Sequence, residues 1–183
     1  MAKRDILIYP NNETELRSKS KPVEAINRRT KRLIQDLKDT LGAYSNGAGL
    51  AAPQINVHLR VVIVQLGSSK QSNDAHREFT TLVNPIILDA GKERRDFDGC
   101  LSFPSLFGET VRPHYLRVSG LDDQGEPFER VFKGFDAVVV HHEIDHLNGV
   151  LFIDHIKDPE KLWRTPESET TDKAVEAAVP PTG

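Results

Sequence analysis

The stretch His142-Glu143-Ile144-Asp145-His146 decides both the fold and the chemistry expected of this chain. In an α-helix, residues four positions apart lie about 40° apart around the axis, so His142 and His146 leave the same face. Two imidazoles on one helical face with a glutamate between them form the HExxH pattern of a catalytic zinc-type site. In such a site the histidines hold the metal and the glutamate acts on its water. The stretch therefore predicts a helix that carries a metal site, and it requires a third protein ligand.

The third ligand separates the protein families that share this pattern. A metzincin reads HExxHxxGxxH. Gly149 fits that pattern, but Phe152 occupies the position of the third histidine and cannot bind a metal. A thermolysin-like enzyme takes a glutamate from a second helix, whereas the downstream glutamates here lie in a polar segment interrupted by Pro159 and Pro166. The upstream half contains Cys100, the only cysteine of the chain. We therefore favour a site of two histidines and one cysteine.

Two upstream segments accompany the HExxH run. They are Gly47-Ala48-Gly49-Leu50-Ala51-Ala52-Pro53-Gln54 and Asp98-Gly99-Cys100-Leu101-Ser102. In this order and at these intervals, the three segments resemble the motifs of the peptide deformylase family, and the resemblance extends from about residue 5 to residue 156. The first motif matches in full. The second departs once, because the family usually has glutamate where this chain has Asp98.

The resemblance implies a metal-dependent hydrolase of N-terminal methionine processing in protein biosynthesis. Such an enzyme removes the formyl group from the N-terminal formyl-methionine of newly made polypeptides. Cys100, His142 and His146 would hold one divalent metal ion and leave a fourth position for water, whose pKa the ion lowers from about 16 towards 7. Glu143 would act as general base for the water and then as general acid for the departing amine.

The resemblance also implies the remaining catalytic groups and the metal. The side-chain amide of Gln54 and the backbone N–H of Leu101 would stabilise the oxyanion of the tetrahedral intermediate. A thiolate beside two imidazoles suits Fe(II), Zn, Co or Ni, and the order of affinities does not choose among them. The family points to Fe(II), with Zn, Ni or Co as substitutes.

A pocket for the methionine side chain can be argued from helix geometry. Val138 and Val139 precede His142 by four and three residues and share its face. The alternative is that both valines simply pack in the core. Glycine leaves room for a peptide backbone to lie alongside the chain and pair as an added strand. The predicted substrate-binding residues are Gly49, Leu50, Leu101, Val138 and Val139.

The aspartate at position 98 leads to a specific expectation. By resemblance to the family's layout, its carboxylate braces the Cys100 loop through a cation, and Arg112 is the candidate. Aspartate is one methylene shorter than glutamate, so the brace needs a slight backbone shift or a bridging water.

The coarse pattern predicts an α+β fold, in which small antiparallel sheets pack around a central HExxH metal-binding helix. The expected elements are a helix over 23–44, strands over 60–66 and 79–88 with a bend at Pro85, a hairpin of 116–121 and 127–132, and the metal helix over 136–148. Asp136 is expected to cap the metal helix and Gly149 to end it. The catalytic domain is predicted to cover residues 1–157, followed by a polar, largely disordered tail over 158–183.

Composition restricts the cellular setting. A net charge of −3 leaves no electrostatic footprint for DNA. The chain has neither a signal-peptide core nor a run of about 20 apolar residues, so we expect a cytoplasmic protein without a membrane span, or an organelle protein if a transit peptide has been trimmed away. We also expect a monomer. A basic cluster in the first predicted helix is most simply a solvated face, with a transient ribosome contact as the alternative. The histidines outside the motif are expected to be surface or capping residues; they are His58, His76, His114 and His155, with His141 a neighbour of the site.

Two other functions remain open. One is an HExxH metallopeptidase, against which the residue at Phe152 and the cysteine ligand argue. The other is a catalytically silent family member that acts as a binding module. The presence of Glu143, Gln54 and all three ligands argues against that alternative.

Overall fold

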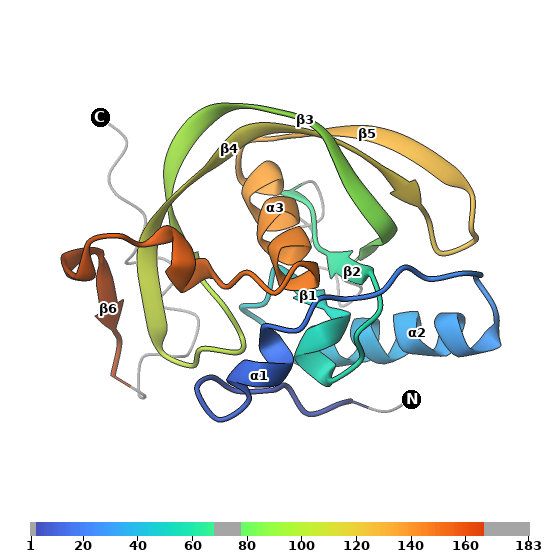
Figure 1. Ribbon diagram of the computed structural model, residues 1–183, viewed down its shortest axis with the longest axis horizontal. Helices are drawn as coiled ribbons and strands as arrows, with labels where there is room; N and C mark the ends of the chain where they lie inside the picture. Colours follow the sequence, from blue (N-terminus) through green and yellow to red (C-terminus); the bar gives the residue numbers. More distant parts are fainter. Residues whose placement is uncertain (1–2, 68–77, 167–183) are drawn as a thin grey trace.

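A single antiparallel sheet organises the molecule. The structure is a computed structural model that describes residues 3–67 and 78–166. Figure 1 shows the long strands curving around helix α3. The strands, in order across the sheet, are β1 (Gly49–Ala51), β2 (Val61–Val64), β3 (Thr80–Gly99), β4 (Leu106–Leu121) and β5 (Pro127–Lys133), and β6 (Leu162–Arg164) pairs with β4. The predicted α+β class is confirmed, but one continuous sheet replaces the small sheets that we expected.

Strand β2 lies between the two main helices, α2 (Arg28–Gly42) and α3 (Phe135–Leu147). Successive side chains of a strand point to opposite faces. Val62 and Val64 accordingly pack in the core cluster that contains α3, whereas Val61 and Ile63 pack in the cluster that contains α2. All four are buried, and each such side chain contributes about 1.5–3 kcal/mol. The helix that carries the HExxH run is therefore anchored in the main core.

Helix α2 begins later than predicted. We expected the helix from residue 23, but it starts at Arg28, after the N-cap Asn27. The Asn27 side chain accepts hydrogen bonds from the backbone N–H groups of Arg29 and Thr30, which satisfies two donors that a helix start leaves free. Val23 instead pairs through its backbone with the side-chain amide of Asn84. The spacing of apolar residues led us to start the helix at residue 23. Asn27, a residue type favoured at N-caps, indicates the later start that the structure shows.

Strands β3 and β4 are much longer than expected. The prediction over 79–88 covered only the first half of β3, and the bend at Pro85 is confirmed by a register shift between Val83 and Ile86. The pairing then continues to Gly99. Charged residues dominate this second half, so apolar alternation could not indicate it. The hairpin between β4 and β5 is confirmed.

The ends of helix α3 differ in how well they were predicted. Asp136 does not cap the start, because Gly134 holds the N-cap position and the Asp136 carboxylate accepts a hydrogen bond from the Gly67 backbone N–H at 2.7 Å. The predicted end is confirmed: Asn148 is the C-cap and Gly149 follows with φ +74°. The run Val138–Val140 is helical despite its β-branched side chains, since packing overrides a short propensity signal.

Gly149→Ala is expected to destabilise the protein by more than about 1 kcal/mol, because its backbone conformation disfavours a side chain. A Cβ there would also collide with the carbonyl group of Arg17. Urea unfolding measures the change in the free energy of unfolding. The matched control is Gly91→Ala, where a Cβ meets nothing within 4 Å. Equal stability of the two variants would contradict this account.

Short elements complete the described chain. They are α1 (Glu13–Leu16) and the 3-10 turns η1 (Ala52–Ile55), η3 (Phe152–His155) and η4 (Pro159–Lys161). Strand β6 follows residue 157, where we expected the catalytic domain to end, and it extends the sheet. Residues 68–77, which include His76, and most of the tail predicted over 158–183 lie outside the described residues. Within the described ranges, no helix combines the length and hydropathy needed to cross a membrane.

Candidate metal centre

The three predicted ligands meet at one point. Cys100 directly follows β3, and His142 and His146 lie one turn apart on α3. One ligand atom from each residue lies within 4.8 Å of the others. The Sγ atom of Cys100 is 3.3 Å from Nε2 of His146. Two imidazole nitrogens and one sulfur at this spacing form a donor set that fits a divalent ion of the Fe(II) or Zn type.

His146 has the protonation state that a ligand requires. Its side chain is buried, and Nδ1 has no hydrogen-bond partner among the described residues. Burial, together with the nearby charge of His142, lowers the pKa of His146 to about 3. The imidazole is therefore neutral at physiological pH and has a free lone pair. A buried, neutral imidazole beside a cysteine sulfur supports the fit to a metal.

His142 is oriented by a contact that the sequence analysis missed. Its Nδ1 lies 2.8 Å from Oδ1 of Asp98, which leaves Nε2 for a metal. Burial lowers the pKa of His142, but the charge and hydrogen bond of Asp98 outweigh burial, so this pKa lies above its ordinary value. A metal would displace the Nε2 proton on binding. The carboxylate therefore holds the ring in the tautomer that ligation needs.

The brace between Asp98 and Arg112 is direct. Oδ2 of Asp98 accepts a hydrogen bond from Nε of Arg112 at 2.6 Å, so no bridging water is needed. The Arg112 side chain is 0% exposed. Burial raises the pKa of Asp98, but His142 and Arg112 hold it below its ordinary value. Asp98 is shorter than the glutamate usual in the family, but it contacts both Arg112 and the predicted ligand His142.

Gln54 lies beside the cysteine sulfur. Its Oε1 accepts a hydrogen bond from the Ala51 backbone N–H at 2.9 Å. Its Nε2 lies 3.1 Å from Oγ of Ser102 and 3.4 Å from Sγ of Cys100. The backbone N–H of Leu101 donates to no other group in the described part of the chain. Both predicted oxyanion donors are therefore next to Cys100.

Glu143 is buried, and its Oε2 atom has no hydrogen-bond partner among the described residues. Burial raises the pKa of Glu143 to about 7, although the charge of His142 opposes the shift. A Cβ at Gly49 would collide with the Glu143 carboxylate. The glycine is therefore required for the position of this side chain, a role that the sequence analysis did not foresee.

The predicted substrate-binding side chains are largely buried. Leu50 belongs to the core cluster of α2, and Val139 belongs to that of α3. Val138 is 3% exposed, and Leu101 packs partly buried against the cluster of α2. These positions agree with core packing as well as with a pocket wall. The pocket role stays a prediction.

A second group of side chains corrects the prediction for His155. We expected a surface or capping residue without metal-type partners, but its Nε2 lies 2.8 Å from Oδ2 of Asp145. His141, Asp145 and His155 could together offer ligand atoms to a metal. However, Nη1 of Arg112 already lies 2.6 Å from Nδ1 of His141 and 2.7 Å from Oδ2 of Asp145. A buried guanidinium thus supplies the positive charge that a cation would bring.

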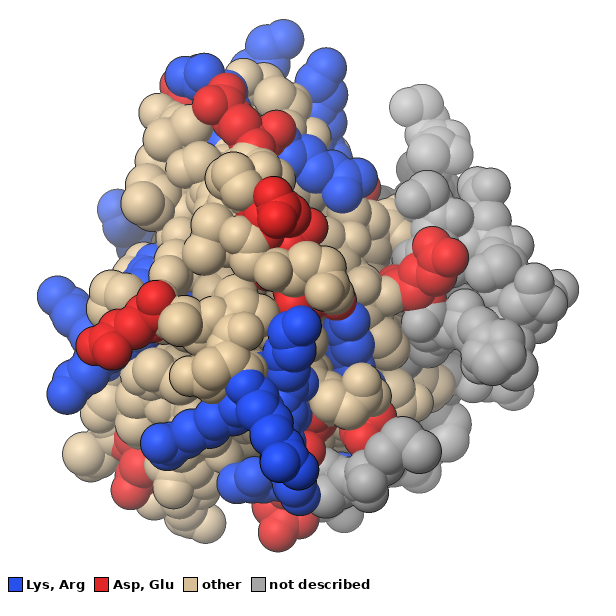
Figure 2. Space-filling model, turned by 90° about the vertical axis from the view of Figure 1, so that its right-hand side faces the viewer, with Lys and Arg blue, Asp and Glu red and all other residues tan. Residues whose placement is uncertain are grey.

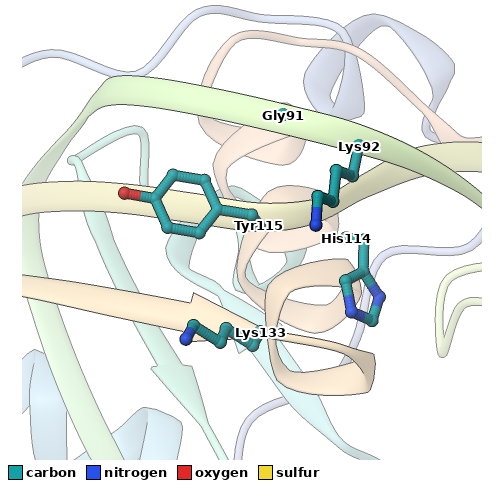
Figure 3. A pocket seen from close by; sticks show the side chains of 5 residues that line it. All are labelled: Gly91, Lys92, His114, Tyr115 and Lys133. Atoms are coloured by element: carbon teal, nitrogen blue, oxygen red, sulfur yellow. The ribbon is translucent and has the colours of Figure 1, made fainter.

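A cavity of about 530 Å³ lies at the β3–β4–β5 face, and Figure 3 shows the residues around it. They are Gly91, Lys92, His114, Tyr115 and Lys133. None of these residues belongs to the predicted site. His114, expected at the surface, is half-buried at the cavity wall. The cavity and the metal centre are thus separate features.

Comparison with known proteins decides the family. The family model described as polypeptide deformylase matches residues 3–162. The chain belongs to the peptide deformylase family. The peptide deformylase of Aquifex aeolicus is 39% identical over 161 residues, which cover 88% of this chain and 89% of that protein.

Solved peptide deformylase structures agree with this assignment. The enzyme from Legionella pneumophila has a TM-score of 0.77 and 35% identity, covering 98% of this chain and 100% of its own. A class I type b peptide deformylase from Acinetobacter baumannii, bound to Met-Ala-Ser, has a TM-score of 0.74 and 33% identity, covering 84% of this chain and 99% of its own. A deformylase accordingly accounts for the three motifs better than a general metallopeptidase does.

Proposed function

We propose that this peptide deformylase hydrolyses the formamide of N-terminal formyl-methionine on new polypeptides, with Cys100, His142 and His146 as metal ligands. The convergence of these three ligand atoms within 4.8 Å carries the proposal. Hydrolysis breaks the bond between the formyl carbon and the methionine nitrogen, and the products are formate and a free amine. The Met-Ala-Ser complex of the Acinetobacter baumannii relative holds a peptide of the kind that such a reaction releases.

The metal has a limited and defined role. When bound, it supplies Lewis acidity, which lowers the pKa of water and polarises the formyl carbonyl. Asp98 holds Nδ1 of His142 and so directs the other ring nitrogen towards the metal. Gln54 donates towards Sγ of Cys100 and so favours the thiolate form that ligation requires.

Glu143 moves the protons. Its buried carboxylate takes a proton from the attacking water and later delivers it to the leaving nitrogen, so the proton count balances. A pKa near 7 suits both transfers, and a divalent cation nearby would lower this pKa by charge attraction. Gly49 gives the carboxylate the space it occupies.

Gln54→Ala is expected to reduce kcat by about 10²–10³-fold, since the loss of one oxyanion donor costs about 2.7–4 kcal/mol of barrier. The variant should still bind metal, because all three ligands remain. Steady-state kinetics and metal analysis measure the two quantities. Gln35→Ala, an exposed glutamine on α2, is the control. If the Gln54→Ala variant bound its full complement of metal and had the kcat of the wild type, Gln54 would have no role in catalysis.

Formate release tests the function. Anaerobically purified protein is given a formyl-methionyl peptide, an acetyl-methionyl peptide and a longer peptide with internal bonds. We expect formate from the first substrate and no cleavage of the other two. Cleavage of internal bonds would support a metallopeptidase, and peptide binding without any cleavage would support a silent binding module.

We further propose Fe(II) as the resident ion, with Zn, Ni or Co as substitutes, because the thiolate and two imidazoles suit all four. Metal analysis of protein isolated without oxygen checks the choice.

We also propose a cytoplasmic monomer. A transient ribosome contact would use the start of α2, where Figure 2 shows Lys and Arg side chains gathered. The exposed basic residues there are Arg28, Arg29, Lys31 and Arg32.

A further inference from the structure

A continuous chain of polar contacts runs from the predicted ligand His142 to His155. Nδ1 of His142 lies 2.8 Å from Oδ1 of Asp98, and Oδ2 of Asp98 lies 2.6 Å from Nε of Arg112. Nη1 of Arg112 lies 2.7 Å from Oδ2 of Asp145, which lies 2.8 Å from Nε2 of His155. These residues come from β3, β4, α3 and η3. The chain of contacts therefore joins four elements of the fold.

We propose that His155 is a positioning residue for the metal ligand His142, acting through Asp145, Arg112 and Asp98. The proposal depends on the proposed function only in treating His142 as a ligand. Nothing in the HExxH pattern indicates a role for a histidine nine residues beyond the second ligand.

The direction of each hydrogen bond is determined by chemistry. A carboxylate oxygen only accepts, so Nε2 of His155 donates to Asp145. Nη1 of Arg112 carries two N–H groups, one for Asp145 and one for Nδ1 of His141 at 2.6 Å. Nε and Nη1 of Arg112 and Nε2 of His155 thus each have a defined acceptor, whereas Nη2 of Arg112 has no partner among the described residues.

The planar guanidinium transmits position along the chain. Because Nε and Nη1 of Arg112 belong to one rigid fork, a rotation at the Asp145 end moves the Asp98 end as well. The Arg112 side chain is 0% exposed, so water does not compete for these contacts. The Asp145 side chain is 14% exposed, so its carboxylate can move more readily than the guanidinium. His155, whose side chain is 27% exposed, donates to this carboxylate and thereby restrains it.

The turn η3 holds His155 in place. Asp154, the preceding residue, accepts a hydrogen bond from the Leu151 backbone N–H and forms an ion pair with Arg17 at 2.9 Å. Neither contact involves the chain of residues that leads to His142. A control for general loss of stability must therefore leave η3 intact. Asn27→Ala meets this need, because it removes the side chain that caps α2 and touches neither η3 nor a member of the chain of contacts.

The test measures the release of cobalt(II) from the loaded protein to an excess of chelator. We expect His155→Phe to speed the release about tenfold, the lower end of the 10–100-fold effects typical of residues outside the ligand shell. His155→Gln keeps a donor near the position of Nε2 and should restore slow release. Asn27→Ala should lower the urea midpoint of the protein and leave the release rate unchanged.

Three results would overturn the proposal. The first is wild-type release from His155→Phe, and the second is equally fast release from Asn27→Ala, which would indicate a general effect of lost stability. The third is a second bound cobalt in the wild type that His155→Phe loses, which would indicate a metal site of its own. Because no substrate is used, failure of this proposal is distinguishable from failure of the deformylase assignment, which the formate assay tests.

Discussion

Replacing Glu143 with glutamine is expected to lower kcat by about 10²–10⁴-fold, the usual contribution of a general acid–base group. Glutamine keeps the shape of the side chain but cannot take a proton from water. The metal should remain bound, because Cys100, His142 and His146 are unchanged. Single-turnover formate release, with metal content measured on the same sample, separates loss of proton transfer from loss of metal.

The control for this variant is Glu129→Gln, an exposed glutamate on β5 that pairs with Arg117. It should leave kcat unchanged. If the Glu143 variant retained a kcat within a few-fold of wild type, another group would have to move the proton. Among the described residues, Asp39 and Asp96 also have a buried carboxylate oxygen without a hydrogen bond, but neither belongs to the group of predicted ligands.

Replacing Arg112 with methionine is expected to destabilise the protein by about 3–5 kcal/mol, because it leaves the buried carboxylate of Asp98 and the mostly buried one of Asp145 without their cation. Methionine approximates the length of the arginine stem, so lost packing contributes little. Asp98 and Asp145 both face the guanidinium, at 2.6 and 2.7 Å. Urea unfolding of the metal-free protein measures the change independently of any ligand effect.

Arg117→Met is the matched control. Arg117 also lies on β4 and pairs with Glu129 at 3.1 Å, but its side chain is 43% exposed. Exposed ion pairs contribute about 0–1 kcal/mol, so this substitution should cost little. Similar destabilisation by both substitutions would show that the buried pair contributes no more than a surface pair.

The helix of the HExxH run was predicted well because two independent constraints agree on it. The spacing of His142 and His146 demands a helix, and Gly149 ends that helix in the conformation that glycine allows. Cys100 was found by elimination among families rather than from local pattern. The meeting of these three side chains was therefore predictable, because few other residue types could serve in their place; their role as ligands stays a prediction.

The contacts that support the ligands were harder to predict. Asp98 was expected to brace a loop, but its second oxygen also contacts His142. His155 pairs with Asp145, ten residues earlier, only because η3 folds back on α3. Carboxylates and histidines are common on surfaces, so their spacing carries little information until the tertiary structure brings them together. The second half of β3 and the first half of β4 were missed for a similar reason. Hydrogen bonds between these two strands hold the segments in the sheet, and their sequences show no alternation of apolar and polar residues.

The placement of both predicted histidine ligands on the buried helix α3 links metal binding to global unfolding. An ion M that binds only the native state adds RT ln(1 + [M]/Kd) to the free energy of unfolding of the protein. This amounts to about 4.1 kcal/mol when the free ion concentration is one thousand times Kd. Chelation should therefore lower the melting temperature of the whole domain rather than loosen one loop. Heat resistance of this enzyme would thus report directly on how fully a cell supplies it with metal.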